Sequence, residues 1–578
     1  MSTWNNRVRV FFEELYRDTQ KIEHTANDID GTVHPVTKVE VRQALRKLKK
    51  KKTGAEDGLV AEMLRTDHQR LLELIAEFFS DLISNKLMPP ESWRRTKLRV
   101  LFKKGDPTMP QNYRPISIIP VMAKLFSTVL YGRIAQQIED SLSEEQFGFR
   151  KGRGCADAVH VMRMIVEKSN EWGEELWMAA LDVEKAFDRV HHSTLFEALL
   201  RAGIDSQVVV ALRTLYCDLK GYVSLWPGAE SRTFAIRRGV RQGDPLSPLL
   251  FNLVLDGALE EVSVVCRKRG YGTNVGQDLK GRRLTHIAFA DDQTLISRSW
   301  LSMRRMLSSL RSALLKRGLT LHPSKCKLQT NSDSWSQRGF VQIENGFGVE
   351  ILPDGEPLQV LGTTLSLQDV TGHEVPNRIA TGWRMFWSMR RLLLNKAVSV
   401  KKRMKLLDST VGSCVLWCTE SWTPRAHELR QVRTAQRAML RRICGGRRTP
   451  EEPWLDWLQR TTRKAIRLAE EAKVRDWPKT HYERKWQWAG HVARRPLTAL
   501  TWRVTSWRDA IWADVEQQMG SQRTMRPSRR RWMKFESAPQ KFCITQGVGN
   551  WMEYASHREE WIARRTDFAS WAMRESKE

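Results

Sequence analysis

The chain has 578 residues, too many for one hydrophobic core, so two to four structural units are expected. Its 95 Lys and Arg outnumber its 66 Asp and Glu, which gives a formal net charge of +29. This excess argues against a merely basic soluble protein and favours a polyanionic partner, most often nucleic acid. No stretch predicts a membrane span, and eight cysteines without a CxxC pair predict reduced thiols in an intracellular protein, not a disulfide scaffold or a zinc site.

Hydrophobic periodicity predicts both helices and strands along the chain. In chain order these are a helical lead-in over 1–36, helices within 37–85, a strand over 97–104, a helix over 117–142, a buried strand over 176–181, helices over 193–201 and 206–218, a hairpin around 227–231, a helix over 245–265, a strand–turn–strand around 288–293, a helix over 302–317 and a hairpin over 358–366. After about residue 376 the strand pattern fades, and long Arg- and Trp-rich helical patterns follow.

Two adjacent acids, Asp291 and Asp292, lie in the stretch AFADDQ between two predicted strands, and Asp182 directly follows the buried strand 176–181. If these strands pair, three carboxylates converge at one sheet edge, where like charges disfavour joint ionisation. A divalent cation relieves that repulsion, and oxygen donors of this kind suit Mg²⁺. The alternative is an ordinary β-turn, which an isolated Asp-Asp pair would favour.

Seven motifs follow one another along the chain and give these acids a context. They are KKGDPTMPQNYRPIS (103–117), EEQFGFRKGRG (144–154), LDVEKAFDRV (181–190), RRGVRQGDPLSPLLFNLVLD (237–256), HIAFADDQTLIS (286–297), GLTLHPSKCK (318–327) and LQVLGTTL (358–365). In this order they resemble the reverse transcriptases of LINE-type elements, the non-LTR retrotransposons. The resemblance is close over about 40–370 and extends weakly to about 530.

The resemblance implies an α+β, right-hand polymerase fold and an RNA-directed DNA polymerase. Its predicted parts are a helical lead-in over 1–36, fingers over 37–175, a palm with an antiparallel sheet over 176–375, a helical thumb over 376–450 and a basic, Trp-rich helical region over 451–578. The implied partners are an RNA template, a DNA primer, the RNA–DNA hybrid and deoxynucleoside triphosphates, with no membrane. The nucleus is the expected location, with the cytoplasm as an alternative. Two other functions stay open: a catalytically idle nucleic-acid-binding scaffold and a maturase-like RNA-binding protein.

The resemblance also implies roles for single residues. Asp182, Asp291 and Asp292 hold two Mg²⁺ ions, with Mn²⁺ as a substitute, and Asp292 is the weaker ligand. Lys325 is a general acid for pyrophosphate. At the incoming nucleotide we expect Lys103, Lys104 and Arg114 on the triphosphate, Phe187 against the 2′-hydroxyl, and Gln242 with Gly243. On nucleic acid we expect Arg150, Lys151 and Arg153 at template phosphates and Gly362 at the bend of a primer-gripping hairpin. The alternatives are a solvated loop for the two fingers lysines and a core position for Phe187.

The C-terminal part adds a basic helix and many tryptophans. A stripe of arginines recurs at helical spacing, with no acid between residues 430 and 448: Arg430, Arg433, Arg437 and Arg441. We expect this stripe to contact the primer–template duplex, with a solvated helix as the alternative. Late tryptophans can stack unpaired bases but are more often core residues; the candidates are Trp454, Trp457, Trp486, Trp488 and Trp532.

Two features depart from the family pattern. A turn that is usually rich in Pro and Gly reads KTGAEDG (52–58), so we expect a less rigid loop. Only about 36 residues precede the resemblance, so we expect no endonuclease domain ahead of the polymerase.

The net charge predicts strongly salt-dependent binding. Because the Lys and Arg side chains displace counterions from phosphates, affinity for an RNA–DNA hybrid should fall by about three orders of magnitude or more between roughly 50 and 200 mM salt. It should change little with hybrid sequence. Fluorescence anisotropy titrations at stepwise salt concentrations measure both effects, and an affinity that is insensitive to salt would contradict the prediction.

Overall fold

The computed structural model describes most of the chain. The described residues are 2–19, 34–52, 54–55, 57–65, 68–225, 230–275, 283–332, 335, 339–368, 372–507 and 534–576. Contacts divide the chain into two compact units. The first unit comprises residues 1–151, 182–268 and 305–322, and the second comprises residues 152–181, 269–304 and 323–578. Each unit combines separate stretches of sequence. This division does not test the five consecutive segments expected from sequence, which stay predictions.

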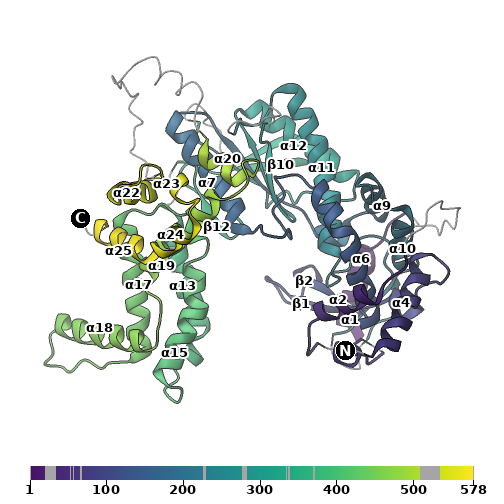
Figure 1. Cartoon of the computed structure of the whole chain (residues 1–578), viewed down its shortest axis with the longest axis horizontal. Helices are drawn as coiled ribbons and strands as arrows, with labels where there is room; N and C mark the ends of the chain where they lie inside the picture. Colours follow the sequence, from purple (N-terminus) through teal and green to yellow (C-terminus); the bar gives the residue numbers. More distant parts are fainter. Residues whose placement is uncertain are drawn as a thin grey trace. The chain divides into compact units, whose positions relative to one another are not determined.

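The first unit contains a four-stranded sheet in the order β2-β1-β4-β5. β1 (Arg95–Phe102) pairs antiparallel with β2 (Tyr113–Ile118) and parallel with β4 (Lys220–Val223), and β4 pairs antiparallel with β5 (Phe234–Ala235). The helices of this unit are α1 (Ser2–Leu15), α2 (Lys38–Lys47), α3 (Ala61–Leu64), α4 (Gln69–Ile83), α5 (Glu91–Arg94), α6 (Val121–Ser141), α8 (Ala186–Arg189), α9 (His192–Arg201), α10 (Ser206–Tyr216) and most of α11 (Ser247–Arg269). α2 packs against both α4 and α6 (Figure 1).

Local chemistry explains where these helices begin. The Thr37 hydroxyl accepts a hydrogen bond from Glu40 N–H, and the Glu40 carboxylate accepts one from Thr37 N–H, so a capping box starts α2. The helix predicted over 117–142 begins later than expected, because residues 113–118 form β2. Pro120 excludes helical geometry from the residue before it and then serves as the N-cap of α6.

The second unit contains a six-stranded sheet in the order β6-β7-β3-β8-β10-β9. Its strands are β3 (Trp177–Asp182), β6 (His286–Phe289), β7 (Asp292–Ser297), β8 (Lys327–Thr330), β9 (Gly339–Glu344) and β10 (Phe347–Ile351). Most pairings are antiparallel, but β8 and β10 run parallel, as do β1 and β4 in the first unit, so both sheets are mixed rather than antiparallel as predicted. The mixed helix and strand content confirms the predicted α+β class.

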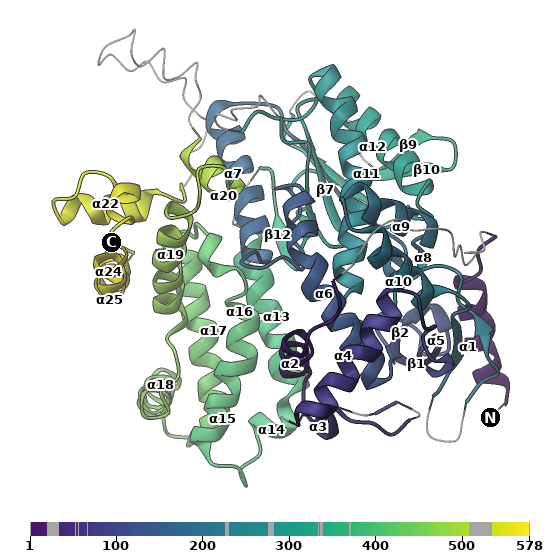
Figure 2. The same ribbon diagram turned by 45° about the vertical axis from the view of Figure 1, so that its right-hand side comes forward.

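Helices dominate the second unit beyond its sheet. They include α7 (Cys155–Trp172), α12 (Trp300–Leu315, which begins in this unit), α13 (Glu374–Ser388), α14 (Arg390–Leu393), α15 (Val400–Leu407), α16 (Ser413–Val415), α17 (Ala426–Cys444), α18 (Trp454–Glu471), α19 (Trp477–Ala493), α20 (Leu500–Ser506), α22 (Ser537–Thr545), α23 (Trp551–Tyr554), α24 (Arg558–Ala563) and α25 (Arg565–Glu575). In both Figure 1 and Figure 2, α13, α15 and α17 lie side by side. They share a core that includes Phe386, Met404 and Met439. Among the described residues after 376 there is no strand, as predicted.

A tryptophan pair joins α19 to the C-terminal helices. The Trp486 and Trp561 rings stack with centroids 3.6 Å apart and planes 3° from parallel. Each indole N–H donates to the backbone carbonyl of the other residue, at 2.7 and 2.9 Å. A Cβ added at Gly490 would lie 2.2 Å from the Trp561 indole nitrogen, so only glycine fits there. The two buried rings therefore pack α19 against α24.

All eight cysteines lie among the described residues, and no disulfide joins any of them. Within the described part of the chain, no helix is long and apolar enough to cross a bilayer.

A buried carboxylate ties the short hairpin of β11 (Leu358–Val360) and β12 (Thr363–Leu365) to α13. Glu374 is fully buried, and its carboxylate accepts hydrogen bonds from the backbone N–H and the hydroxyl of Thr364. The Arg378 guanidinium donates to it at 2.7 Å, and the Arg163 guanidinium of α7 lies 3.6 Å away. These donors balance the cost of burying the charge.

Replacing Glu374 should therefore destabilise the second unit strongly. Glu374→Ala leaves the buried Arg163 and Arg378 charges without their acid, so we expect a loss of about 3–5 kcal/mol of unfolding free energy. The matched control is Glu350→Ala, which breaks a half-exposed pair with Lys327 and should cost about 1 kcal/mol or less. Thermal and urea unfolding of the three proteins measures the difference. Equal losses for both variants would contradict the assigned role of Glu374.

Candidate active site

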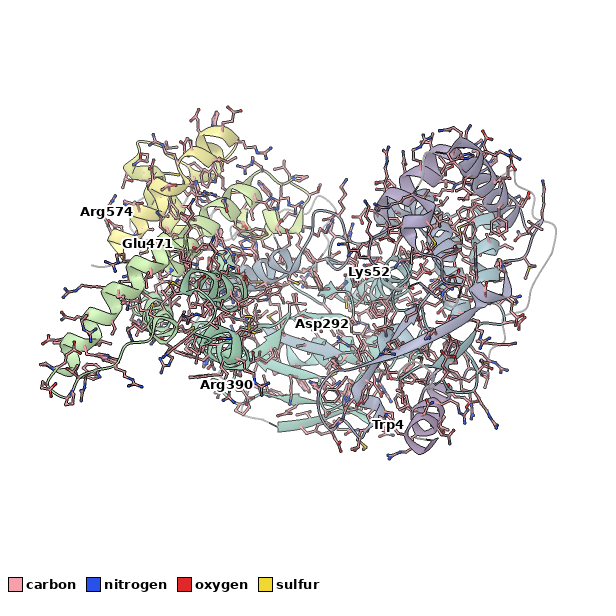
Figure 3. The ribbon with its side chains drawn as sticks, turned by 90° about the horizontal axis from the view of Figure 1, so that it is seen from below. Trp4, Lys52, Asp292, Arg390, Glu471 and Arg574 are labelled. Carbon is pink, nitrogen blue, oxygen red and sulfur yellow. The ribbon has the colours of Figure 1, made fainter. Side chains whose placement is uncertain are left out.

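The predicted acids lie at strand ends of the six-stranded sheet, and Asp182 is the residue at which the division between the two units falls. β3 ends at Asp182, β7 begins at Asp292, and these two strands are neighbours in the sheet. Asp182 and Asp291 are half-buried, whereas Asp292 is exposed beside the strands (Figure 3). The backbone carbonyl of Asp182 accepts a hydrogen bond from His322 N–H at 2.8 Å, which fixes the chain at the end of β3. The strand-end positions inferred from sequence are thus confirmed.

The turn that presents Asp291 and Asp292 is strained. Phe289 and Asp292 face each other across the β6–β7 hairpin, and Ala290 and Asp291 form the turn. Ala290 has φ = 54°, in the left-handed region that residues with a Cβ rarely adopt, and its side chain is buried. Such a conformation costs about 1–3 kcal/mol and persists only where the surroundings enforce it. Strain of this kind clusters at functional sites.

The three acids are residue types that bind divalent metal ions. Carboxylate oxygens on neighbouring strand ends are the hard donors that Mg²⁺ prefers, so the residue types fit. Among the described residues, which include all three aspartates, no group of three or more His, Cys, Asp or Glu side chains is arranged to hold a metal ion. The three-acid cage therefore stays a prediction.

α7 begins close to the acidic turn. The pKa of the Cys155 thiol is raised, first because the thiol is buried and second because of the negative charge of Asp292. The loop before this helix is held by Arg495, whose guanidinium donates to the Gly152 carbonyl at 2.5 Å and to the Asp157 carboxylate at 3.2 Å.

Phe187 sits in an aromatic cluster of the first unit. Its ring stacks on Phe251 of α11, with centroids 4.4 Å apart, and meets the Phe149 ring edge-on at 6.2 Å. The ring is half-buried, so one part is packed while another stays accessible. Contacts on two sides hold the ring rigidly, which is what a steric barrier requires.

Gln242 and Asp188 form a hydrogen-bonded pair beside this cluster. The Gln242 amide nitrogen donates to both Asp188 oxygens, at 3.0 and 3.1 Å, and the Tyr16 hydroxyl donates to Asp188 at 2.9 Å. Burial raises the pKa of Asp188 to about 6, while the Tyr16 hydrogen bond, the Lys185 charge and the Gln242 hydrogen bond act in the opposite direction. Sequence analysis missed Tyr16, since nothing in a lone Tyr after an apolar run indicates a partner 172 positions away.

Gly243 satisfies two constraints that no other residue meets. Its φ is +118°, and an added Cβ would lie 3.0 Å from the Ser117 carbonyl oxygen. The neighbouring Gln242 carbonyl accepts a hydrogen bond from Ser117 N–H at 2.8 Å, so this loop is fastened along the end of β2. The fold itself therefore requires glycine at this position, and the approach of a nucleotide to Gly243 stays a prediction.

The three cations predicted for the triphosphate lie at one end of the β1–β2 pair. Lys103 and Lys104 follow β1, Arg114 belongs to β2, and all three side chains are exposed. Lys185 lies near the same strand, because its ammonium donates to the Gln111 and Tyr113 carbonyls at 2.9 and 3.1 Å. Positive charge thus gathers on one side of the first unit.

The three cations predicted for template phosphates separate in the structure. Arg150 is buried, and its guanidinium donates to the Glu139 carboxylate at 2.8 Å, to the Gln146 carbonyl at 3.0 Å and to the Ser143 carbonyl. These bonds commit Arg150 to its own fold and favour a structural role over phosphate contact. Lys151 is exposed and Arg153 is half-buried, and their phosphate contacts stay predictions.

Gly362 lies at the bend of the β11–β12 hairpin, as predicted, with φ = +72°. Its neighbour Leu361 also has a positive φ of 50°, and the Trp417 indole N–H donates to the Leu361 carbonyl at 3.2 Å. The Trp417 hydrogen bond therefore holds the turn, and Glu374 holds the adjoining strand β12. Lys325 is exposed on the turn before β8.

The basic stripe on α17 is only half available. Arg430 and Arg437 are exposed. Arg433 contacts the Met573 sulfur of α25 at 3.6 Å, and Arg441 donates to the Thr462 hydroxyl of α18 at 3.1 Å. Duplex binding by the stripe stays a prediction, which the geometry favours for the two exposed arginines.

The tryptophan candidates also divide. Trp454 is 58% exposed on α18, Trp486 is a core residue, and Trp488 packs edge-on against His160 with centroids 5.7 Å apart. The Trp457 indole donates to the Gly446 carbonyl at 3.2 Å, and Trp532 lies outside the described residues. Of the four candidates that the structure describes, Trp454 is the exposed one, so base stacking stays a prediction that exposure favours for Trp454.

Residues 102–365 match the family described as reverse transcriptase (RNA-dependent DNA polymerase). The chain carries a reverse transcriptase domain. The matched range of this domain includes Asp182, Asp291 and Asp292, as well as Phe187 and Gln242.

Related proteins confirm the LINE-type, non-LTR resemblance of the reverse transcriptase domain. The Retrovirus-related Pol polyprotein from type-1 retrotransposable element R2 of Popillia japonica is 29% identical over 294 residues, covering 51% of this chain and 39% of that protein. The RNA-directed DNA polymerase from mobile element jockey of Drosophila funebris is 23% identical over 478 residues, covering 80% of this chain and 49% of that protein. The chain thus spans less than half the length of either relative.

A solved structure of telomerase from Candida albicans, in complex with a telomeric RNA fragment, aligns over 76% of this chain and 69% of that chain. Its TM-score is 0.34 at 10% sequence identity.

The buried Asp188 predicts a pH-dependent difference in stability. In the folded protein this carboxyl group keeps its proton up to about pH 6, whereas its ordinary pKa is 3.8. The folded state therefore binds more protons between these values, and the unfolding free energy contributed by Asp188 falls as pH rises from about 4 to about 6. Asp188→Asn removes this dependence. Urea unfolding of both proteins at pH 4, 5, 6 and 7 gives the difference, and a difference that is constant with pH would contradict the assignment.

Proposed function

We propose that this chain is an RNA-directed DNA polymerase of a non-LTR retrotransposon, which extends a DNA primer on an RNA template within a right-hand polymerase fold. The observation that carries the proposal is the reverse transcriptase domain over 102–365, in which Asp182 and Asp292 end neighbouring strands of one sheet. The net charge of +29 supports a nucleic-acid substrate. Since the target of such an element is chromosomal DNA, the nucleus is the proposed place of action.

Asp182 and Asp291 would hold two Mg²⁺ ions, or Mn²⁺ in their place, with Asp292 as the weaker ligand. Bound there, the ions would supply charge stabilisation for the entering and leaving oxygens of nucleotidyl transfer. The half-buried position of Asp291 and the exposed position of Asp292 support this ranking of the two.

The first unit would bind and select the nucleotide. Phe187, held between Phe251 and Phe149, would block a ribose 2′-hydroxyl by steric exclusion. Gln242 and Gly243 would lie along the base and sugar. The exposed cations of the β1–β2 end would neutralise the triphosphate, and Lys325 would give a proton to pyrophosphate; these cations are Lys103, Lys104 and Arg114.

The remaining exposed cations would hold nucleic acid. Lys151 and Arg153 lie before α7 and would contact template phosphates, and the bend at Gly362 would support the primer end. Arg430 and Arg437 would follow the RNA–DNA hybrid, which proteins recognise by its shape and backbone. No observation on the described residues favours the idle-scaffold or maturase-like alternatives.

Primer extension on an RNA template tests the proposal and ranks the two adjacent acids. Asp291→Ala should lower the extension rate by about 10³-fold or more, because an uncompensated charge would remain in the transition state. Asp292→Ala should lose less. The matched control is Asp354→Ala, an exposed turn residue of the same unit, which should extend like wild type.

Binding of an RNA–DNA hybrid, measured in parallel, separates the alternatives. Wild type that binds the hybrid but does not extend would support the idle scaffold and contradict the proposal. Extension by Asp291→Ala at the wild-type rate would contradict the assigned role of the acid.

A further inference from the structure

The segment that follows α1 reaches the nucleotide side of the first unit. Tyr16 lies just beyond α1, is 5% exposed, and donates its hydroxyl hydrogen to Asp188, which is 2% exposed. The same carboxylate accepts both contacts of the Gln242 amide. Tyr16 and Gln242 therefore meet through one buried acid, although Tyr16 precedes the matched reverse transcriptase domain by more than 80 residues.

Tyr16 also holds the loop that carries Gln242 at a second point. Its backbone carbonyl accepts a hydrogen bond from Arg237 N–H at 3.1 Å, and the Leu15 carbonyl accepts one from the Arg238 guanidinium at 2.7 Å. Backbone carbonyls of the α1 segment thus hold the start of the loop by hydrogen bonds. The Tyr16 side chain holds the loop again at Gln242, through the shared Asp188 carboxylate.

The helix that bears Phe187 is fastened to the same loop. Val240 N–H donates to the Phe187 carbonyl and Gly239 N–H to the Val190 carbonyl, both at 2.7 Å. A Cβ at Gly239 would lie 2.6 Å from the Asp188 carbonyl oxygen, so loop and helix are in contact. A shift of the Asp188 carboxylate would therefore change the positions of both Gln242 and Phe187.

We propose that Tyr16 is a positioning residue for nucleotide selection: its hydroxyl orients Asp188, which in turn fixes Gln242 and the short helix carrying Phe187. This inference rests on the proposed function for its substrate, a deoxynucleoside triphosphate. The N-terminal segment thereby sets the affinity for the nucleotide and the discrimination against ribose.

The physical reason lies in the burial of the Asp188 carboxylate. A buried carboxylate keeps its orientation only while donors hold it, and a hydrogen bond to a charged group is among the stronger ones. Without the Tyr16 hydroxyl, the Asp188 carboxylate loses a donor that shares its Oδ1 atom with Gln242, and the Gln242 amide loses its fixed orientation. The chemistry at the strand-end acids is untouched, so the effect should fall on nucleotide binding and selection.

Tyr16→Phe removes only the hydroxyl and keeps the ring against Phe12 and Phe234. In steady-state extension we expect the KM for the deoxynucleotide to rise by about tenfold, as for the loss of one hydrogen bond to a charged group. We expect kcat to stay within about twofold and the preference for deoxynucleotides over ribonucleotides to fall. In an Asp188→Asn background, Tyr16→Phe should add little, because both changes act on one pathway.

Two control variants separate positioning from packing. Leu15→Ala removes a buried side chain next to Tyr16, and Glu13→Gln breaks the pair of Glu13 with Arg9 on the outer face of α1. Neither removes the hydroxyl, so neither should raise KM as Tyr16→Phe does. A KM for Tyr16→Phe equal to that of wild type, or an equal rise for Leu15→Ala, would overturn the inference.

A second measurement does not depend on DNA synthesis. Amide hydrogen exchange over residues 239–247 should be faster in Tyr16→Phe than in wild type and in Glu13→Gln, because the loop has lost one fixed point. Unchanged exchange there would overturn the inference even if wild type extends primers. If wild type extends nothing, the proposed function fails, and faster exchange in Tyr16→Phe would still support the positioning role of Tyr16.

Discussion

A buried carboxylate must find donors, and this requirement organises both units of the chain. In the first unit, Asp188 draws together a residue that follows α1, a residue of the α10–α11 connection and the helix that bears Phe187. In the second unit, Glu374 draws together α7, α13 and the β11–β12 hairpin. In each case segments more than a hundred positions apart in sequence are held by one charge, which makes the local geometry both specific and sensitive to substitution.

Much of the candidate site could be predicted from sequence because its signals are local. Asp182 follows a buried strand and Asp291 and Asp292 interrupt two others, and the structure has the acids at these strand ends. Gly243 and Gly362 both have positive φ, as a turn glycine suggests. The hairpin of β9 and β10 was not predicted, although its Asn345-Gly346 turn is a strong local signal.

What could not be predicted depends on partners distant in sequence. Arg150 has the same charge as Lys151, the next residue in the sequence, yet Arg150 is buried and paired with Glu139 while Lys151 is exposed. The spacing of the arginines predicts that they share one helix face but not what covers that face. Here Met573 contacts Arg433, and Thr462 accepts a hydrogen bond from Arg441. Composition and spacing report charge, whereas only packing decides whether that charge remains available.

The pairing of Trp486 with Trp561 bears on how the chain can be shortened. A protein cut after α20 would retain the Trp486 ring and the space above Gly490 without Trp561, so apolar ring surface would face water and the Trp486 indole N–H would lose its carbonyl acceptor. Helices within residues 534–576 thus cover the apolar face of α19 that carries Trp486. Fragments designed to isolate the reverse transcriptase domain should either keep both members of the pair or remove both.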